Sequence, residues 1–190
     1  MSGVEHRLGS RSIPCGWAVS SSPLVARAVA VSRGTHAVTV SSCPTELVDA
    51  PVETVWELLT DPAGWSSFYD LRAIRVEPPG LARVGQRIFG ESGPRWLHLA
   101  VTLTYAAIDV SQRSLRLEVQ MPLGIAVREE LSCSPISDRQ CRVNYHCHFS
   151  LPSGWRGALL RLLMRRELRV GPVDSLGRLK QAAEQRFTTR

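Results

Sequence analysis

The sequence lacks the patterns that mark several large classes of protein. No uninterrupted apolar run approaches the roughly 20 residues of a membrane-spanning helix, so no such helix is predicted. The chain also has no phosphate loop, no Rossmann glycine pattern and no Ser-His-Asp arrangement. Its five cysteines show no CxxC spacing, and their odd number favours the reduced thiols of a cytoplasmic protein.

Lysine is nearly absent, and the positive charge lies at the two ends of the chain. Lys180 is the one lysine among 23 basic residues, a bias that suggests a GC-rich bacterial genome. Residues 36–150 carry ten arginines and thirteen acidic residues, whereas residues 151–190 carry nine basic and three acidic residues. The net charge of +6 therefore does not describe a nucleic-acid groove in the body of the fold, and no nucleic-acid partner is predicted.

The chain of 190 residues is long enough for one domain with a substantial core, preceded by a tail. Residues 1–34 contain an apolar stretch with small residues, but residues 20–23 (SSSP) interrupt it, whereas a signal peptide has an unbroken apolar centre. We predict a flexible tail over 1–34, or a later start of translation, and a single domain over 35–190. Export from the cytoplasm stays the alternative.

The segment from Val48 to Trp65 predicts two short helices directly after a strand. Pro51 suits a first helical turn, where its missing N–H costs nothing, and Glu53 suits the positive end of that helix. Asp61 and Pro62 predict the end of this helix and the start of the next, with Asp61 as the capping residue. The predicted apolar face of the first helix is Val52, Val55, Trp56 and Leu59.

Four later segments alternate between apolar and polar residues, which predicts strands with one face on the core and one in water. These segments are 97–108, 115–121, 125–134 and 141–149. Other strands are predicted at 36–48, with an irregularity at Pro44, and at 71–77 and 83–91. Because the turns between successive strands are short, we expect an antiparallel meander.

The C-terminal part, from about Pro152 to Phe187, predicts an amphipathic helix that Gly171-Pro172 should kink or split. Its apolar stripe is Leu159, Leu162, Leu163, Leu176, Leu179 and Ala183. A sheet with one apolar face must cover that face. We therefore predict an α+β fold in which a curved antiparallel sheet wraps around the terminal helix, leaving a cavity between them, while the two short helices close one end.

Three segments also carry a family resemblance. They are DAPVETVWELLTDPAGW at 49–65, the step Arg83-Val84-Gly85 and SLGRLKQAAEQ at 175–185. With them, residues 36–187 resemble the START/Bet v 1-like (SRPBCC) superfamily, which includes polyketide cyclases/dehydratases and lipid-transport proteins. The resemblance implies the helix-grip fold and a hydrophobic small-molecule ligand. It implies no catalytic residues, because the matching motif is a folding motif.

Glu129 is the exceptional residue on its strand. Its parity points it inward among Ile125, Val127, Leu131 and Cys133, where an apolar environment would raise its pKa and make it a candidate acid or base. Tyr145 is also inward, and we assign these two as candidate catalytic residues. The alternatives are a bulge that shifts the parity, or a Glu129–Arg pair at the rim.

The residues expected to line the ligand cavity share an inward position on the strands, the second short helix or the terminal helix. Trp65 and Phe68 are expected at the entrance, while Trp56 holds the helices to the core. Tyr105 and Tyr145 either orient the ligand or are core residues with bonded hydroxyls. The full set is Trp65, Phe68, Leu99, Val101, Leu103, Tyr105, Leu117, Val119, Val127, Leu131, Val143 and Leu163.

Neither a metal nor a cofactor is predicted. His146 and His148 share one strand face, but no third ligand has the spacing of a zinc site. Arg161, Arg165 and Arg169 form a basic stripe, which either contacts an anionic membrane or simply faces water. We favour the second interpretation, because the sheet needs the apolar side of the helix.

Three functional hypotheses follow. The first is a protein that binds a lipid- or polyketide-like hydrophobic molecule between the sheet and the terminal helix. The second is a cofactor-independent cyclase or dehydratase that uses Glu129 and a cavity tyrosine as acid–base groups. The third is a lipid-transfer module that contacts a membrane through the basic helix. The oligomeric state stays open.

Overall fold

The computed structural model describes residues 38–93 and 99–189. Internal contacts divide the chain into two units, Met1–Gly34 and Thr35–Arg190, and all described residues belong to the second. The tail predicted at 1–34 therefore lies outside the described residues. None of the described helices is long and apolar enough to cross a membrane.

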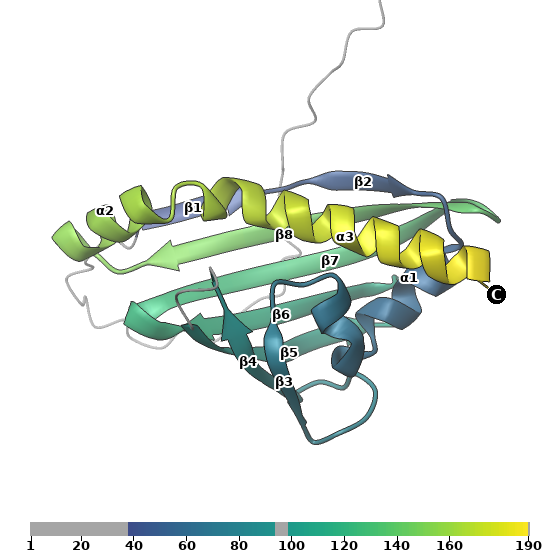
Figure 1. Cartoon of the computed structure of the whole chain (residues 1–190), viewed down its shortest axis with the longest axis horizontal. Helices are drawn as coiled ribbons and strands as arrows, with labels where there is room; N and C mark the ends of the chain where they lie inside the picture. The colour runs from purple at the N-terminus through teal and green to yellow at the C-terminus, as the bar shows by residue number, and fades with distance from the viewer. Residues whose placement is uncertain (1–37, 94–98, 190) are drawn as a thin grey trace, which may run out of the picture. The chain divides into compact units, whose positions relative to one another are not determined.

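The strands of the described residues form one curved antiparallel sheet (Figure 1). Its order is β1-β8-β7-β6-β5-β4-β3, and β2 also pairs with β8, so the edge strand is interrupted at Cys43-Pro44 as Pro44 predicts. The strands are β1 (Val38–Ser42), β2 (Thr45–Val48), β3 (Arg72–Glu77), β4 (Arg87–Ser92), β5 (Leu99–Asp109), β6 (Ser114–Met121), β7 (Ile125–Ser137) and β8 (Gln140–Leu151).

The alternation read from the sequence determines which face of the sheet forms the core. Leu103, Leu117 and Val143 are fully buried on the concave face, and their neighbours in the strands are exposed or half-buried. A bulge after Tyr105 shifts the register with β6, so that Ile108 opposes Leu115. The alternation of 97–108 would place Ala107 on the inner face with Tyr105, but the extra residue of the bulge reverses the parity after Tyr105.

The two short helices are α1 (Val52–Leu59) and the 3-10 helix η1 (Pro62–Ser67). Pro62 opens η1 as predicted, but the Asp61 side chain makes no capping hydrogen bond. Glu53 lies in the first turn of α1, and its carboxylate is bound to Arg113 of the β5–β6 turn at 2.7 Å. Glu53 therefore ties α1 to the sheet.

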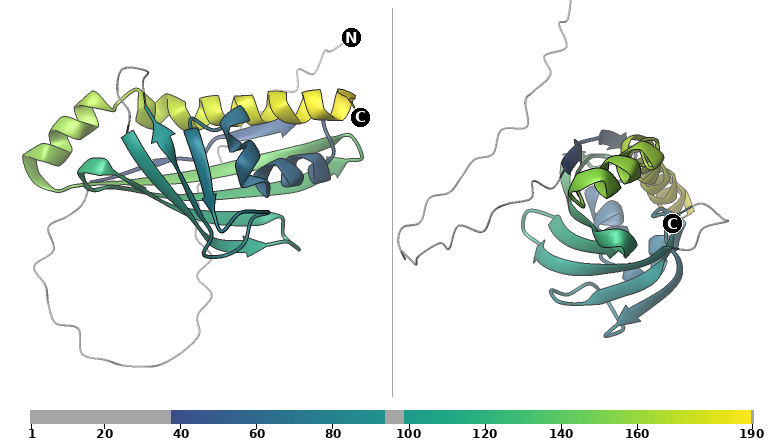
Figure 2. Two further views of the ribbon diagram at one scale, coloured as in Figure 1. Left: turned by 60° about the horizontal axis from the view of Figure 1, so that its bottom comes forward. Right: turned by 90° about the vertical axis from the view of Figure 1, so that its left-hand side faces the viewer.

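The C-terminal segment forms two helices, α2 (Gly154–Leu163) and α3 (Glu167–Thr189). They separate at residues 164–166, earlier than the predicted split, and Pro172 lies inside α3. Figure 2 shows α3 along the concave side of the sheet, where Leu176, Leu179 and Ala183 are buried. The predicted apolar stripe is wrong for α2, whose Leu159, Leu162 and Leu163 are exposed.

Close packing at Gly90 of β4 gives a test of the sheet. A Cβ atom there would lie 2.7 Å from Leu71 Cγ and 2.9 Å from the backbone oxygen of Arg72. We expect Gly90→Ala to lower the free energy of unfolding by about 1–3 kcal/mol, because the backbone of the adjacent strand β3 must shift. Urea unfolding monitored by circular dichroism measures the change.

Gly177 in α3 is the matched control, since a Cβ there meets nothing within 4 Å. Gly177→Ala should raise the free energy of unfolding by about 0.5–1 kcal/mol, because alanine loses less backbone entropy in a helix. Equal effects of the two substitutions would contradict the packing described for β3 and β4.

Candidate functional site

Glu129 lies on β7 on the concave face of the sheet, directly opposite Leu117 of β6 and Cys147 of β8. Only 3% of the residue is exposed, although its neighbours Arg128 and Glu130 are exposed. The inward position predicted by parity is therefore correct, and no bulge displaces it. A carboxyl group therefore lies in a core that is mostly apolar.

Tyr69 contacts this carboxyl group most closely. Its hydroxyl donates a hydrogen bond of 2.6 Å to Glu129 Oε1, and Cys147 Sγ lies 3.9 Å from the same oxygen. Glu129 Oε2 is also buried, but it has no hydrogen-bond partner among the residues that the structure describes. One carboxyl oxygen is therefore satisfied, and the other has a free acceptor position.

The Trp65 side chain positions Tyr69. Its indole Nε1 donates to the carbonyl oxygen of Leu59 at 3.2 Å, and its ring lies 5.4 Å from the ring of Tyr69. The Tyr105 hydroxyl donates to the same Leu59 carbonyl at 3.2 Å. The end of α1 therefore fixes an aromatic cluster, which in turn places the Tyr69 hydroxyl against Glu129.

Burial dominates the electrostatics of the site. It raises the pKa of Glu129 to about 7, although the Tyr69 and Tyr145 hydroxyls and the Cys147 thiol favour the charged form. Burial also raises the pKa of Tyr69 and of Tyr145, and the Glu129 carboxylate raises both further. At neutral pH both tyrosines are thus hydrogen-bond donors, and Glu129 is poised between its two protonation states.

A small cavity lies beside this group of side chains, between the sheet and α3. Its volume is about 10 Å³, enough for about one water molecule. It is lined by Trp65, Phe68, Tyr69, Leu131, Tyr145, Ser175, Leu176 and Leu179. This cavity is far smaller than the one expected from the curved sheet, because α3 packs closely over the aromatic cluster.

A larger hollow of about 390 Å³ lies elsewhere, between β1, α2 and the start of α3. Its lining is Val40, Ala158, Arg161, Leu162, Arg165, Leu168 and Arg169. Neither Glu129 nor the two tyrosines border it. The basic residues and the buried carboxyl group therefore belong to two separate places in the domain.

The predicted lining residues divide into three groups. Trp65, Phe68, Leu131 and Tyr145 border the small cavity. Leu163 does not line the interior, because it is 70% exposed on α2, and Leu99 is half-buried. The others are buried in the core: Val101, Leu103, Tyr105, Leu117, Val119, Val127 and Val143.

Trp65 lies deeper in the core than predicted, whereas Trp56 packs against the core as predicted. Trp65 is fully buried at the centre of the aromatic cluster, and Phe68 is buried beside it, so neither forms an exposed entrance. Trp56 is half-buried and packs against the core from outside. Tyr105 is a core residue, since its hydroxyl is bound to the backbone at Leu59.

Tyr69 and Ser175 complete the polar lining, and the sequence patterns did not single out either one. Tyr69 follows η1 in a segment without periodicity, and it meets Glu129 from 60 positions away. Ser175 lies on the buried side of α3, where an unbroken helical period places it beside Leu176 and Leu179. Ser175 could have been identified from the sequence by including polar residues when the inward-facing positions of the C-terminal helix were assigned.

The histidines of β8 do not form a metal site in the part of the chain that the structure describes. His148 Nδ1 is 2.8 Å from the hydroxyl oxygen of Ser41 on β1. No group of three or more His, Cys, Asp or Glu side chains suited to a metal ion occurs among the described residues. The pairing with Ser41 agrees with a surface role for His148.

A family model described as polyketide cyclase / dehydrase and lipid transport matches residues 35–184. No curated protein sequence matches the chain. Among solved structures, the Zhui aromatase/cyclase from Streptomyces sp. R1128 is similar, with 17% identity, a TM-score of 0.63 and coverage of 78% of this chain and 96% of that one.

Two further structures have the same fold. Norcoclaurine synthase from Thalictrum flavum is 12% identical with a TM-score of 0.60, over 87% of this chain and all 100% of that one. The protein TTHA0849 from Thermus thermophilus is 18% identical with a TM-score of 0.60, over 77% of this chain and 99% of that one. At these identities the likeness establishes the helix-grip fold, and it leaves the chemistry to be argued from the residues.

The raised pKa of Glu129 makes the folding stability depend on pH. Between about 4.5 and about 7, the folded protein holds a proton that the unfolded chain has released. The protonated Glu129 contributes its full stabilisation below the pKa that it has in the unfolded chain. The contribution is lost at about 1.4 kcal/mol per pH unit as the pH rises from that value to the pKa of Glu129 in the folded protein. Glu129→Gln should become more stable relative to wild type by roughly 3 kcal/mol across the interval.

Urea unfolding of both proteins at several pH values measures this difference. Glu130→Gln is the control, because Glu130 is the next residue on β7 and faces solvent. It should follow the wild-type pH dependence. If Glu129→Gln also ran parallel to wild type from pH 4.5 to 7, Glu129 would not be protonated in the folded protein.

Proposed function

Because the chain belongs to the polyketide cyclase/dehydrase and lipid-transport family, we propose that it binds a hydrophobic small molecule, lipid- or polyketide-like, between the curved sheet and α3. The family match agrees with the resemblance in the sequence and covers nearly the whole described domain. Both activities in the family description concern molecules with large apolar parts. The apolar concave face of the sheet suits such a ligand.

The observation that carries the proposal is the unsatisfied oxygen of Glu129. A buried polar atom without a partner costs the domain about 1–3 kcal/mol, so its retention in a core requires a structural or functional reason. Glu129 Oε2 is buried in an apolar surrounding, with the hydroxyls of Tyr69 and Tyr145 nearby. A hydroxyl or enol group of a hydrophobic ligand would satisfy it.

Binding requires the interior to open, since the cavity bordered by Tyr69 and Tyr145 has a volume of only about 10 Å³. The start of α3 is the segment suited to move. It follows the break at 164–166, and Pro172 removes one backbone hydrogen bond from its early turns. Outward movement of this end would lift Ser175 and Leu176 away from the tyrosines and enlarge the cavity where it now closes.

Retained ligand gives the direct test. Native mass spectrometry of protein purified from its own host should detect a bound apolar molecule that organic solvent extracts. Glu129→Gln should reduce its occupancy by about tenfold or more, because a charge-assisted hydrogen bond is lost. Glu130→Gln should retain the ligand as wild type does; equal loss in both variants would remove Glu129 from the proposal.

The second candidate is an enzyme, favoured by the pKa of about 7 for Glu129. A general base works best when its pKa is near the working pH. In this mechanism the Glu129 carboxylate takes a proton from the carbon next to a substrate carbonyl, the C–H electron pair moves into the enolate, and Tyr145 or Tyr69 donates a hydrogen bond to the enolate oxygen. In ring closure the enolate carbon attacks a second carbonyl carbon of the substrate, the C=O π electrons move to that oxygen, and Glu129 returns its proton there. In water elimination Glu129 instead gives the proton to the β-hydroxyl, which leaves as water while the enolate electrons form the C=C bond.

Deuterium exchange at the acidic carbon of a hydrophobic β-keto ester tests this chemistry without knowledge of the natural substrate. Wild type should accelerate exchange over buffer, with a rate that rises with pH through about 7 as Glu129 ionises. Glu129→Gln should abolish the acceleration, and Tyr145→Phe should weaken it. Exchange at the buffer rate, together with a retained ligand, would leave a binding protein and reject the enzyme.

A further inference from the structure

Helix α2 exposes its apolar side to solvent. Trp155, Leu162 and Leu163 are 73%, 68% and 70% exposed, and Leu159 is also exposed. Positions 155, 159 and 162 are spaced by four and three residues, so these side chains lie on one face of the helix. Large apolar side chains that are exposed together on a surface helix require an explanation, because they lower the solubility of the protein and do not contribute to its core.

The opposite face of α2 is the one that packs on the domain. Gly157 is buried, and Leu160 and Met164 pack against the core. A Cβ atom at Gly157 would lie 1.7 Å from the backbone oxygen of Pro152, so only glycine permits this contact. The close approach fixes the rotation of α2, which therefore cannot turn to bury Leu162 and Leu163.

Arginines surround the exposed apolar face. Residues 151–169 contain Arg156, Arg161, Arg165, Arg166 and Arg169, and Glu167 is their one acidic residue. All five are exposed, and none forms an ion pair with an acidic side chain that the structure describes. The local charge is therefore strongly positive, beside large apolar side chains.

The hollow of about 390 Å³ adjoins this face. Three of the arginines, Arg161, Arg165 and Arg169, line it together with Leu162 and other apolar side chains. Guanidinium groups bind phosphate oxygens with two parallel hydrogen bonds. An anionic headgroup would fit the basic side of the hollow, and its acyl chains would continue along the exposed leucines.

We propose that α2 docks the protein on the surface of an anionic phospholipid bilayer. Trp155, Leu162 and Leu163 enter the boundary between headgroups and acyl chains, and the arginines bind lipid phosphates. Ten residues of helix are only about 15 Å long, so α2 lies in the interface and does not span the bilayer. This docking is independent of whether the interior binds a ligand or catalyses a reaction.

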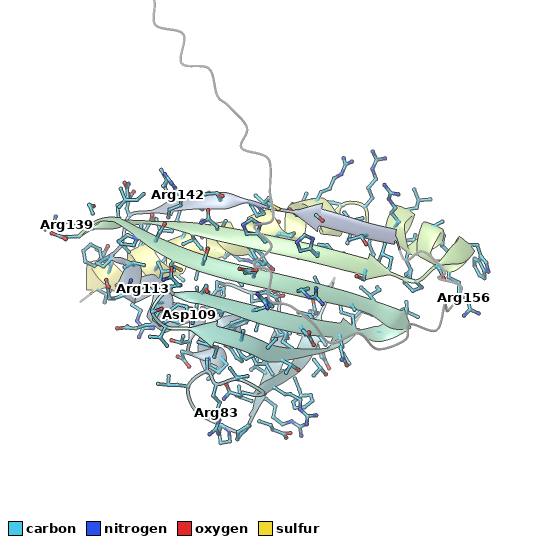
Figure 3. The ribbon with its side chains drawn as sticks, turned by 180° about the vertical axis from the view of Figure 1, so that it is seen from behind. Arg83, Asp109, Arg113, Arg139, Arg142 and Arg156 are labelled. Carbon is cyan, nitrogen blue, oxygen red and sulfur yellow. The ribbon has the colours of Figure 1, made fainter. Side chains whose placement is uncertain are left out.

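The charge distribution favours a bilayer over a protein partner. The basic residues lie on both flanks of the apolar face, which is the arrangement of interfacial helices, with tryptophan and leucine on one side and arginine around it. Figure 3 shows Arg156 at the end of the domain opposite Arg139 and Arg142. Both ends of the domain therefore carry arginines, but the exposed apolar face of α2 lies only at the end that carries Arg156.

Vesicle co-sedimentation tests the proposal with the full-length protein. Wild type should bind phosphatidylcholine vesicles that contain phosphatidylglycerol, and it should bind pure phosphatidylcholine far less. Arg161→Gln/Arg165→Gln should weaken binding by about 25-fold, since each arginine near an anionic surface contributes about fivefold. Trp155→Ala/Leu162→Ala should weaken it by roughly tenfold or more through the loss of buried apolar area.

Arg139→Gln/Arg142→Gln is the matched control, because it removes the same charge from the other end of the domain. It should bind within a factor of about two of wild type, since these arginines lie far from the apolar face. Equal loss in the two arginine pairs would mean that net charge alone drives binding, and it would overturn the proposal. Absence of wild-type binding to anionic vesicles would overturn it as well, as would equal binding to neutral ones.

Insertion of Trp155 gives a second readout. Phospholipids brominated on their acyl chains should quench the fluorescence of bound wild type, and Trp155→Phe should bind with most of this quenching removed. If wild type instead formed a dimer that Leu162→Glu dissociated, without binding vesicles, α2 would be a protein interface and not a membrane anchor.

Discussion

The carbonyl oxygen of Leu59 is the point on which the arrangement of the candidate site depends. It accepts hydrogen bonds from Trp65 and from Tyr105, so it joins the end of α1, the following 3-10 helix and the centre of the sheet. Carbonyls at helix ends lack partners within the helix, and these two donors supply them inside the core. Trp65 then supports Tyr69, and Tyr69 reaches Glu129. The site is thus a consequence of how α1 ends.

The buried carboxyl group of Glu129 lowers the stability of the folded domain. Every other large side chain near it is apolar or is a tyrosine, and an apolar residue would pack there without a raised pKa or an unpaired oxygen. Retaining a carboxyl group in such a position makes physical sense if a ligand or a transition state interacts with it. The tight packing of α3 over the small cavity implies that this interaction occurs in a more open conformation.

Much of the fold could be predicted from local patterns, and the rest depends on contacts between distant residues. Period-two alternation placed Glu129 and Tyr145 on the inner face correctly, because parity needs only the strand itself. It failed after Tyr105, where a bulge adds one residue, and it could not find Tyr69, whose position comes from packing on Trp65. The helical stripe also failed in α2, because contact between Gly157 and Pro152, rather than the sequence period, determines the rotation of that helix.

The most direct test of the central claim is a crystal structure of the protein with the ligand that it retains from its own host. We expect density for an apolar molecule beneath α3, with a polar atom about 3 Å from Glu129 Oε2 and the start of α3 displaced outward. A ligand held only in the hollow between β1 and α2, with Glu129 still enclosed beside Tyr69, would contradict it.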